Sequence, residues 1–434
     1  MKSEIHCVSI QNESSQGRQG NRDMIVFLRR LIEIQNALNF NFYFVGGCIR
    51  DAFLGIQSMD IDIATDGELD SLGQILSSNY DFNFSKLGTA KIKMGAYHVD
   101  LASFREEIYS KNNGLPEVVA GDLSSDIMRR DFTINTGYIL LSEESIFWIL
   151  NPECKASMKV SFAHPLFETD IETRTLRILH ELSFEEDASR VLRAIKYMTI
   201  YHLELEPTTL RAFKKAIDNG RLELYSRNRY RQILLTYIEH PMWVALFTEL
   251  YSHGAIIDAG KEAPQQLIKI LRTLNAVPLQ LDEWTEKVTF LLLLYENNLS
   301  FWFDTDKKIS NIAKTIDTLI KELQHKMDVE ALTKYNVYKL LKGKEECCIA
   351  FLMATSLLDP IIKVTIEEYV IHGKYHHLTI NGNVLKSLGF QMGKEIGTAL
   401  NLLLEHEVNF NKNLSREEEI EWIESYIYEH RDKT

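Results

Sequence analysis

Two aspartates one residue apart, Asp60 and Asp62, lie in the alternating stretch MDIDIAT. On a β-strand, residues i and i+2 project from the same face, so both carboxylates can reach one ion. Carboxylate oxygens are the ligands that Mg²⁺ prefers, and Mg²⁺ also binds substrate phosphates. Two metal ions held in this way can assist an attacking hydroxyl and a leaving pyrophosphate. The spacing by itself also fits a strand face turned to solvent.

A glycine turn precedes this pair in the stretch FVGGCIRDAFLG. Gly46 and Gly47 carry no side chains, so their backbone N–H groups can approach a triphosphate closely. Arg50 would add a charge-assisted contact to the same phosphates. The turn does not match the G-x-G-x-x-G pattern of dinucleotide sites. Gly-Gly, Arg-Asp and D-x-D together therefore indicate a nucleoside triphosphate and a divalent metal.

A second polar cluster lies in EEDASRVLRAIKY, where Asp187 and Arg190 are three residues apart. On a helix such residues are neighbours. An ionised Asp only accepts hydrogen bonds and an Arg only donates them. Cytosine and adenine both present an amino donor beside a ring-nitrogen acceptor, whereas guanine and uracil present the reverse order. A rigid Asp–Arg pair would accept C and A and reject G and U; the alternative is a simple helix salt bridge.

The elements that position these residues change character along the chain. Helical periodicity covers residues 24–38 and 48–55, and strand patterns cover 40–45, 59–65, 90–104 and 133–141. Strand signals fade beyond about residue 170, and six helical segments follow at 188–205, 207–219, 227–240, 286–298, 310–327 and 417–430. The predicted class is α+β, with an N-terminal α/β head on a mixed sheet and an all-helical remainder.

Composition excludes several classes of protein. No apolar run in the 434 residues approaches the ~18 needed for a membrane span, and the N-terminus has no apolar core of a secretory signal. Five irregularly spaced cysteines without a CxxC pattern argue against a disulfide framework or a zinc site, so a cytoplasmic location is expected. With a net charge of −13, a nucleic-acid partner would require local basic surface.

Four segments occur in the order in which they are found in one family: VGGCIRDAFLG with MDIDIAT, DIMRRDFTINTGYI, LRILHELSFEEDASRVLRAIKY, and LTINGNVLKSLGFQMGKEIGTALNLLLE. The chain resembles the class II tRNA nucleotidyltransferases (CCA-adding enzymes) and bacterial poly(A) polymerases. The resemblance implies a polymerase β-like nucleotidyltransferase head and a helical neck, body and tail. The predicted divisions are a disordered tail 1–22, head 23–150, neck 151–240 (base recognition), body 241–370 and tail 371–434 (tRNA binding).

The resemblance also implies roles for individual residues of the head. Asp60 and Asp62 would be the metal ligands and catalytic residues, and Gly46, Gly47 and Arg50 would contact the triphosphate. Asp100, in YHVDLASF, stands where related sequences carry a third acidic residue. It would assist the 3′-hydroxyl or a second metal; the alternative is a surface aspartate at a strand end.

Further nucleotide-binding residues are implied downstream. Arg130, Asp131 and Asn135 match the motif for ribose 2′-hydroxyl recognition, although Asp131 alone would also fit a strand-bracing role. In the base-selecting motif, Glu186 would support Arg190 and Arg193 would face phosphate. Lys196 stands where relatives commonly carry Arg, so a bidentate phosphate contact is not implied there. The residues assigned to the motif are Glu186, Asp187, Arg190, Arg193 and Lys196.

The polar stretch between Phe104 and Asp122, REEIYSKNNGLPEVVAG, is poorly periodic and is predicted to be a loop. The resemblance implies the flexible loop that switches such enzymes from C to A addition, which argues against a CC-only enzyme. An ordinary solvent loop is the alternative.

The implied function is template-independent addition of CMP, CMP and AMP to tRNA 3′ ends. CTP and ATP would be the nucleotides, Mg²⁺ the cofactor in a two-metal mechanism and the tRNA acceptor arm the partner, with no role for DNA or a membrane. An A-adding or CC-adding enzyme and a poly(A) polymerase share the quoted motifs. A non-catalytic RNA-binding protein is a further alternative, but it would not need the metal carboxylates.

Overall fold

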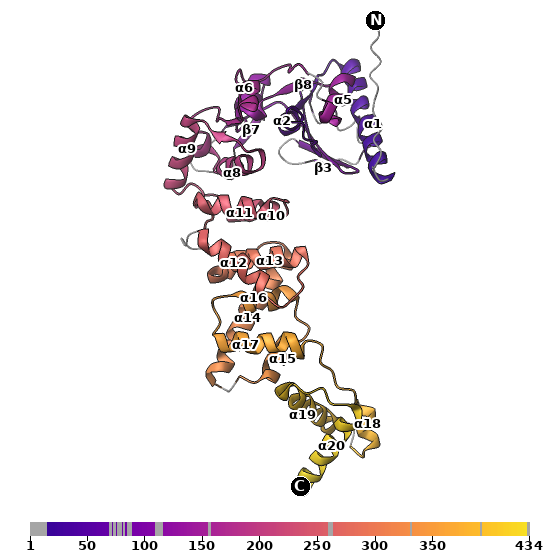
Figure 1. Cartoon of the computed structure of the whole chain (residues 1–434). Coiled ribbons are helices and arrows are strands. Elements are labelled where there is room, and N and C mark those ends of the chain that lie inside the picture. Colours follow the sequence, from indigo (N-terminus) through magenta and orange to yellow (C-terminus); the bar gives the residue numbers. More distant parts are fainter. Residues whose placement is uncertain are drawn as a thin grey trace. The chain divides into compact units, whose positions relative to one another are not determined.

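The computed structural model describes residues 15–68, 72, 75, 80, 83–84, 89–108, 116–154, 158–258, 264–329, 332–390 and 393–431. The chain forms two compact units, Met1–Tyr225 and Ser226–Thr434, which are considered separately here. In Figure 1 the labelled strands lie in the indigo-to-magenta part of the chain, and the orange and yellow parts are helical. The predicted α+β class is confirmed. The unit boundary falls inside the predicted neck, and the finer division into four parts stays a prediction.

A six-stranded mixed sheet organises the first unit, in the order β3-β4-β5-β2-β1-β8. Its strands are β1 (Phe42–Val45), β2 (Asp60–Thr65), β3 (Asn83–Phe84), β4 (Thr89–Met94), β5 (Tyr97–Ser103) and β8 (Tyr138–Leu140). The β2–β5 pair is parallel, and the neighbouring pairs are antiparallel. Ile61 and Ile63 are buried on one face of β2, so the alternation of the strand turns Asp60 and Asp62 to the opposite face.

Helices and short elements complete the first unit. They are α1 (Ser15–Leu38), α2 (Gly47–Phe53), α4 (Leu123–Met128), α5 (Glu143–Leu150), α6 (Phe167–Glu172), α7 (Ser183–Glu186), α8 (Ser189–Tyr201) and α9 (Pro207–Asp218), with 3₁₀ turns η1 (Thr133–Asn135) and η2 (Pro152–Cys154) and the strand pair β9 (Thr175–Leu176) and β10 (Glu204–Leu205). The α1 helix lies against β1 and β4. This helix begins at Ser15, so residues 15–22 of the tail predicted to be disordered (1–22) are helical. A helix can continue through polar residues beyond the part that packs against the sheet. Residues 1–14 lie outside the described residues.

Two predicted local structures differ from those observed. The strand expected over 133–141 is reduced to β8, because Thr133–Asn135 form η1, in which Thr136 Oγ1 donates to the Thr133 carbonyl at 2.6 Å. The loop expected between Phe104 and Asp122 has paired ends, β6 (Arg105–Ile108) and β7 (Glu117–Ala120). Ion pairs of Glu107 with Arg105 and Arg129 neutralise the polar side chains that had suggested a loop. The connecting residues 109–115 lie outside the described residues.

The described part of the second unit is helical. Its elements are α10 (Arg227–Ile238), α11 (Trp243–Ser252), α12 (Pro264–Ala276), α13 (Glu283–Leu294), η3 (Glu296–Trp302), α14 (Lys307–Val329), α15 (Lys334–Leu341), α16 (Glu346–Ala354), α17 (Pro360–Glu368), the π-helical η4 (Tyr369–Gly373), α18 (Gly382–Ser387), α19 (Lys394–Phe410) and α20 (Arg416–Arg431). Within the described ranges, no helix combines the length and apolar character that a membrane crossing requires.

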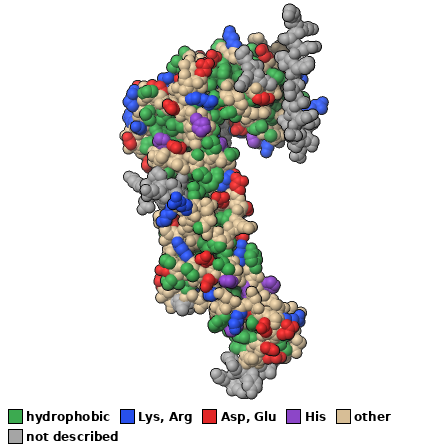
Figure 2. Space-filling view, viewed as in Figure 1, with side chains coloured by type: hydrophobic (Ala, Val, Ile, Leu, Met, Phe, Trp, Pro, Cys, Tyr) green, Lys and Arg blue, Asp and Glu red, His purple; other side chains and the backbone are tan. Residues whose placement is uncertain are grey.

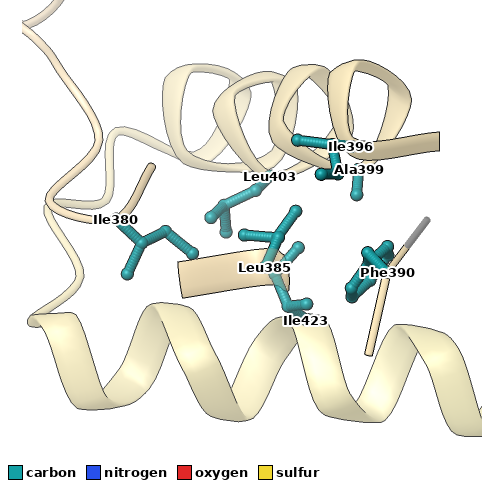
Figure 3. Close-up of a cluster of buried hydrophobic side chains, with 7 residues drawn as sticks. All are labelled: Ile380, Leu385, Phe390, Ile396, Ala399, Leu403 and Ile423. Carbon is teal, nitrogen blue, oxygen red and sulfur yellow. The ribbon is translucent and has the colours of Figure 1, made fainter. Parts of the chain in front are cut away.

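The last three helices share a small core of their own. Figure 3 shows Leu385 of α18 between Leu403 of α19 and Ile423 of α20, with Ile396 and Phe390 beside it. Leu385, Leu403 and Ile423 are completely buried. Glu419 is buried as well, and it accepts hydrogen bonds from the backbone N–H groups of Thr379 and Ile380. This carboxylate therefore holds the segment that enters α18 against α20.

We expect Leu385→Ala to lower the free energy of unfolding of the second unit by about 2–5 kcal/mol, because it leaves a cavity between three helices. Lys386→Ala is the matched control, since that neighbouring side chain is exposed and its loss should change stability by less than ~0.5 kcal/mol. Chemical denaturation monitored by circular dichroism measures both. Equal effects of the two substitutions would contradict this description of the core.

Candidate active site

Three aspartates meet on neighbouring strands of the sheet. Asp62 of β2 is in register with Asp100 of β5, and Asp60 is in register with His98. Asp60 is exposed and lies 3.5 Å from His98 Nδ1, whereas Asp62 is half-buried. Asp100 forms an ion pair with Lys91 of β4. The parallel β2–β5 pairing thus brings a carboxylate from residue 100 beside the D-x-D pair.

Electrostatics at this edge of the sheet favour a bound cation. Burial raises the pKa of Asp62 to about 6, and the nearby charges of Asp100 and Asp60 contribute to the increase, while Arg130 opposes it. Among the described residues, no three His, Cys, Asp or Glu side chains are gathered into a closed metal site. A Mg²⁺ site needs only one or two carboxylates, because waters and substrate phosphates supply the other oxygens. Asp60 and Asp62 fit that donor set.

The turn between β1 and α2 can be occupied only by glycine at its first position. Gly46 has φ +70°, and a Cβ there would lie 2.9 Å from Arg130 Nη1 and 3.5 Å from Asp62 Oδ2. Both the left-handed backbone and the close guanidinium therefore oppose any side chain. The missing side chain lets the Arg130 guanidinium and the Asp62 carboxylate lie close to the N-terminus of α2.

Arg50 is buried beneath this turn and is occupied by protein groups. Its Nε and Nη2 donate to Asp51 Oδ1, Nη2 also donates to Tyr201 Oη at 2.7 Å, and Nη1 donates to Asn135 Oδ1 at 2.7 Å. The guanidinium lies over the rings of Tyr197 and Tyr201. These bonds use four of its five N–H groups. Arg50 thus holds α2 against η1 and α8, and its triphosphate contact stays a prediction.

A continuous polar network extends from Arg50 to the base-selecting motif. Asn135 Nδ2 donates to Asp131 Oδ1 at 2.8 Å, and Asp131 Oδ2 lies 3.3 Å from Arg193 Nε. Arg193 Nη2 in turn donates to Asp187 Oδ2 at 3.3 Å. Although burial opposes it, Arg193 and the Asn135 amide hold the pKa of Asp131 below its usual range. Asp131 and Asp187 are therefore linked through one guanidinium, and Arg193 bridges two carboxylates where a phosphate contact had been expected.

The Asp187–Arg190 pair does not form as the helical spacing predicts. Asp187 has an extended backbone just before α8, and its Oδ1 accepts from the backbone N–H of Ser189 at 2.9 Å. Arg190 is buried, and it donates to Ser183 Oγ at 2.7 Å and to the carbonyl of Arg129 at 2.9 Å. Glu186 lies 3.8 Å from Arg190 Nη1, the supporting position expected. The i,i+3 geometry fails because α8 begins only at Ser189.

Lys196 lies on α8, half-buried near the carboxylates. Burial lowers its pKa, and Arg50 lowers it further, while Asp60 and Asp51 oppose the shift. The charge of Lys196 therefore acts on the same region as Arg50 and Asp60.

Comparison with known proteins places this geometry in a family. The model of the poly(A) polymerase head domain matches residues 42–151. These residues hold the β1–α2 turn, the three aspartates and the Arg130–Asn135 segment. The chain is similar to members of the class II tRNA nucleotidyltransferase and poly(A) polymerase superfamily.

Relatives within this superfamily carry two different names. The A-adding tRNA nucleotidyltransferase of Aquifex aeolicus is 26% identical over 345 residues, which are 75% of this chain but only 40% of the relative. The CCA-adding enzyme of Streptococcus thermophilus is 26% identical over 397 residues, covering 85% of this chain and 89% of the relative. The chain thus spans less than half of the A-adding relative.

Solved structures of the superfamily share the fold over nearly the whole chain. The Thermotoga maritima CCA-adding enzyme, in a complex with tRNA, has a TM-score of 0.63 at 22% identity, covering 95% of this chain and 97% of that one. A CCA-adding enzyme in complex with CTP has a TM-score of 0.64 at 23% identity.

Sequence reasoning missed several residues on which this superfamily site depends. Tyr197 and Tyr201 enclose Arg50, and Asp126 and Tyr138 hold Arg130. Asp126 stands in the quoted stretch DIMRRDF, so its spacing of four from Arg130 was a usable signal. The tyrosines resemble ordinary core residues in the sequence, because only tertiary packing places them around a guanidinium.

In the metal-free protein we expect Asp62 to titrate near pH 6, above the ordinary value of 3.8. The carboxyl would be mostly protonated below that pH and ionised above it. Asp100→Asn removes a negative neighbour and should lower the pKa, whereas Arg130→Gln removes a positive one and should raise it. Carboxyl carbon NMR shifts measured against pH test this. A pKa near ~4 that neither substitution moves would contradict the expected electrostatics.

Proposed function

We propose that this chain is a Mg²⁺-dependent CCA tRNA nucleotidyltransferase that adds CMP, CMP and AMP to tRNA 3′ ends. The polar network from Arg50 to Asp187 carries the proposal. It joins Arg50, Asn135, Asp131 and Arg193 in one connected set. A nucleotide with its phosphates at the Gly46 turn and its base at α8 would meet the members of this set along its length. The order of these contacts would correspond to the order of phosphate, ribose and base in a nucleotide.

An A-adding enzyme is the second candidate, because the relatives from Aquifex aeolicus and Geobacter sulfurreducens carry that name. The matched region is 40% and 45% of those two relatives, but 89% of the Streptococcus thermophilus and Limosilactobacillus fermentum CCA-adding enzymes. The motifs common to both groups do not separate them, so product length must decide.

The chemistry would be in-line attack of the RNA 3′-hydroxyl on the α-phosphate, with release of pyrophosphate. Asp60 and Asp62 would hold Mg²⁺, which neutralises charge on phosphate oxygens when bound. Gly46 leaves space for the phosphates, and Arg130 Nη1 faces the same space. Asp100, paired with Lys91, lies where it can orient the attacking hydroxyl. Most of the rate enhancement would come from positioning and charge stabilisation.

Base selection would require Asp187 to change its partner. Its carboxylate is bound to Arg193 and to the backbone of Ser189. An incoming cytosine or adenine offers an amino donor to this acceptor, and Arg190 offers donors to the ring nitrogen. Guanine and uracil present a carbonyl to Asp187 instead, so they gain no hydrogen bond in exchange for the lost ion pair.

The tRNA acceptor arm and the nucleotides CTP and ATP are the proposed partners, in a cytoplasmic setting. On the face shown in Figure 2, Lys and Arg side chains are interspersed with Asp and Glu. With a net charge of −13, the chain would bind RNA through local contacts, which should weaken as salt increases.

A product-length assay tests the proposed activity. Purified protein is given tRNA ending at the discriminator base, at C or at CC, with each NTP singly and together. We expect CCA to be completed with CTP and ATP, and GTP or UTP to be used at least about 100-fold more slowly. A single A added to tRNA-CC, with no C added to shorter tRNA, would favour the A-adding candidate. Incorporation of GMP at rates near CMP would contradict the role of Asp187.

Substitution of a metal carboxylate separates catalysis from binding. Asp62→Asn should lower the rate by about 100-fold or more while tRNA binding, measured by filter binding, persists. Asp66→Asn is the matched control, because Asp66 is exposed just beyond the end of β2 and accepts its hydrogen bonds from the backbone and side chain of Asn41. Unchanged activity of Asp62→Asn would overturn its assignment as a metal ligand.

A further inference from the structure

A buried carboxylate that the proposed mechanism does not use lies behind the glycine turn. Asp126 of α4 is 1% exposed. Its Oδ1 accepts from Arg129 Nε at 2.9 Å and from the backbone N–H of Arg105 at 3.2 Å. Its Oδ2 accepts from Arg130 Nη2 at 3.1 Å and from the Tyr138 hydroxyl. Burial opposes ionisation, but Arg130 and Arg129 hold the pKa of Asp126 below its usual range.

These contacts determine which edge of the Arg130 guanidinium faces the site. Nη2 is bound to Asp126, and Nε donates to Tyr138 Oη at 2.9 Å. The ring of Tyr138 lies under the guanidinium, 4.8 Å from ring centroid to Cζ. The third nitrogen, Nη1, donates to the Asn135 carbonyl at a long 3.4 Å and lies 2.9 Å from the position that a Cβ of Gly46 would take. Arg130 is therefore held by Asp126 and Tyr138 on one side, and its Nη1 lies at the Gly46 turn on the other.

We propose that Asp126 is the positioning residue for Arg130, holding its guanidinium so that Nη1 faces a bound nucleotide at the Gly46 turn. Asp126 does not touch the nucleotide itself. The inference rests on the proposed function for the identity of the ligand, a nucleoside triphosphate. Because a planar guanidinium bound on two nitrogens cannot rotate freely, loss of the carboxylate would release the edge that faces the site.

Asp126→Asn tests this without changing side-chain volume. An amide replaces one acceptor with a donor that faces Arg130 and Tyr138, so Arg130 should move. For AMP addition to tRNA-CC we expect kcat/KM for ATP to fall between about 10- and 100-fold, mainly through a higher KM. The affinity for ATP with Mg²⁺, measured by equilibrium dialysis without tRNA, should fall in parallel. In an Arg130→Gln background, Asp126→Asn should have little further effect, because its target is absent.

Asp170→Asn is the matched structural control. Asp170 is also 1% exposed and is paired with Arg177 at 3.0 Å, and its Oδ2 accepts from Thr133 at 2.6 Å. It should lower thermal stability but change kcat/KM by less than about 3-fold, which is under ~1 kcal/mol in activation free energy. A comparable loss of kcat/KM in Asp126→Asn and Asp170→Asn, or losses that multiply in the Asp126→Asn/Arg130→Gln double variant, would overturn the proposal.

Tyr138→Phe keeps the test decisive if Asp126→Asn does not fold. It removes the hydroxyl shared by Asp126 and Arg130 and should produce a smaller loss of ATP affinity that also disappears in the Arg130→Gln background. An unchanged affinity would count against the proposal. A wild-type protein that binds ATP but adds no AMP would overturn the proposed function alone, since the coupling of Asp126 to Arg130 is still measured from ATP affinity.

Discussion

A series of charged and polar side chains, buried except for the partly exposed Arg193, links elements of the first unit. It extends from Asp51 and Arg50 through Asn135 and Asp131 to Arg193. A buried charge without a partner costs several kcal/mol, roughly, whereas a paired and fully hydrogen-bonded one does not. Each member therefore requires the next to be in place. The helices α2 and α8 and the turn η1 can satisfy these charges only in the arrangement observed.

This constraint also explains why residues predicted to touch substrate have protein partners. Arg50 and Arg193 hold other side chains, and Asp187 is bound by Arg193. An ion pair that a substrate can replace keeps both charges partnered before the substrate binds. Exchange of the ion pair for a base makes recognition selective, because a base with the wrong order of donors and acceptors does not replace the lost hydrogen bonds.

The second unit depends on a different balance between apolar packing and buried polar contacts. Its described helices bury aliphatic and aromatic side chains, and the final three helices close around Leu385, Leu403 and Ile423. Buried polar groups there, such as Glu419, bind the backbone and so define where one helix begins. Non-directional apolar packing tolerates many sequences, which is why this region carries few recognisable motifs apart from the fourth quoted segment, at residues 378–405.

The sequence by itself determined the α+β class and the strand face shared by Asp60 and Asp62, because alternation is a local property. It also indicated the family through four ordered motifs. The need for glycine at position 46 came from the structure, through its positive φ and the nearby Arg130 guanidinium. Tertiary structure alone decided that Asp100 stands beside Asp62, since strand register joins residues distant in the chain. It likewise decided that Asp187 binds Arg193 and not Arg190, and that Tyr197 and Tyr201 enclose Arg50. The physical reason is that charges choose partners by distance in space and by burial, neither of which residue spacing specifies.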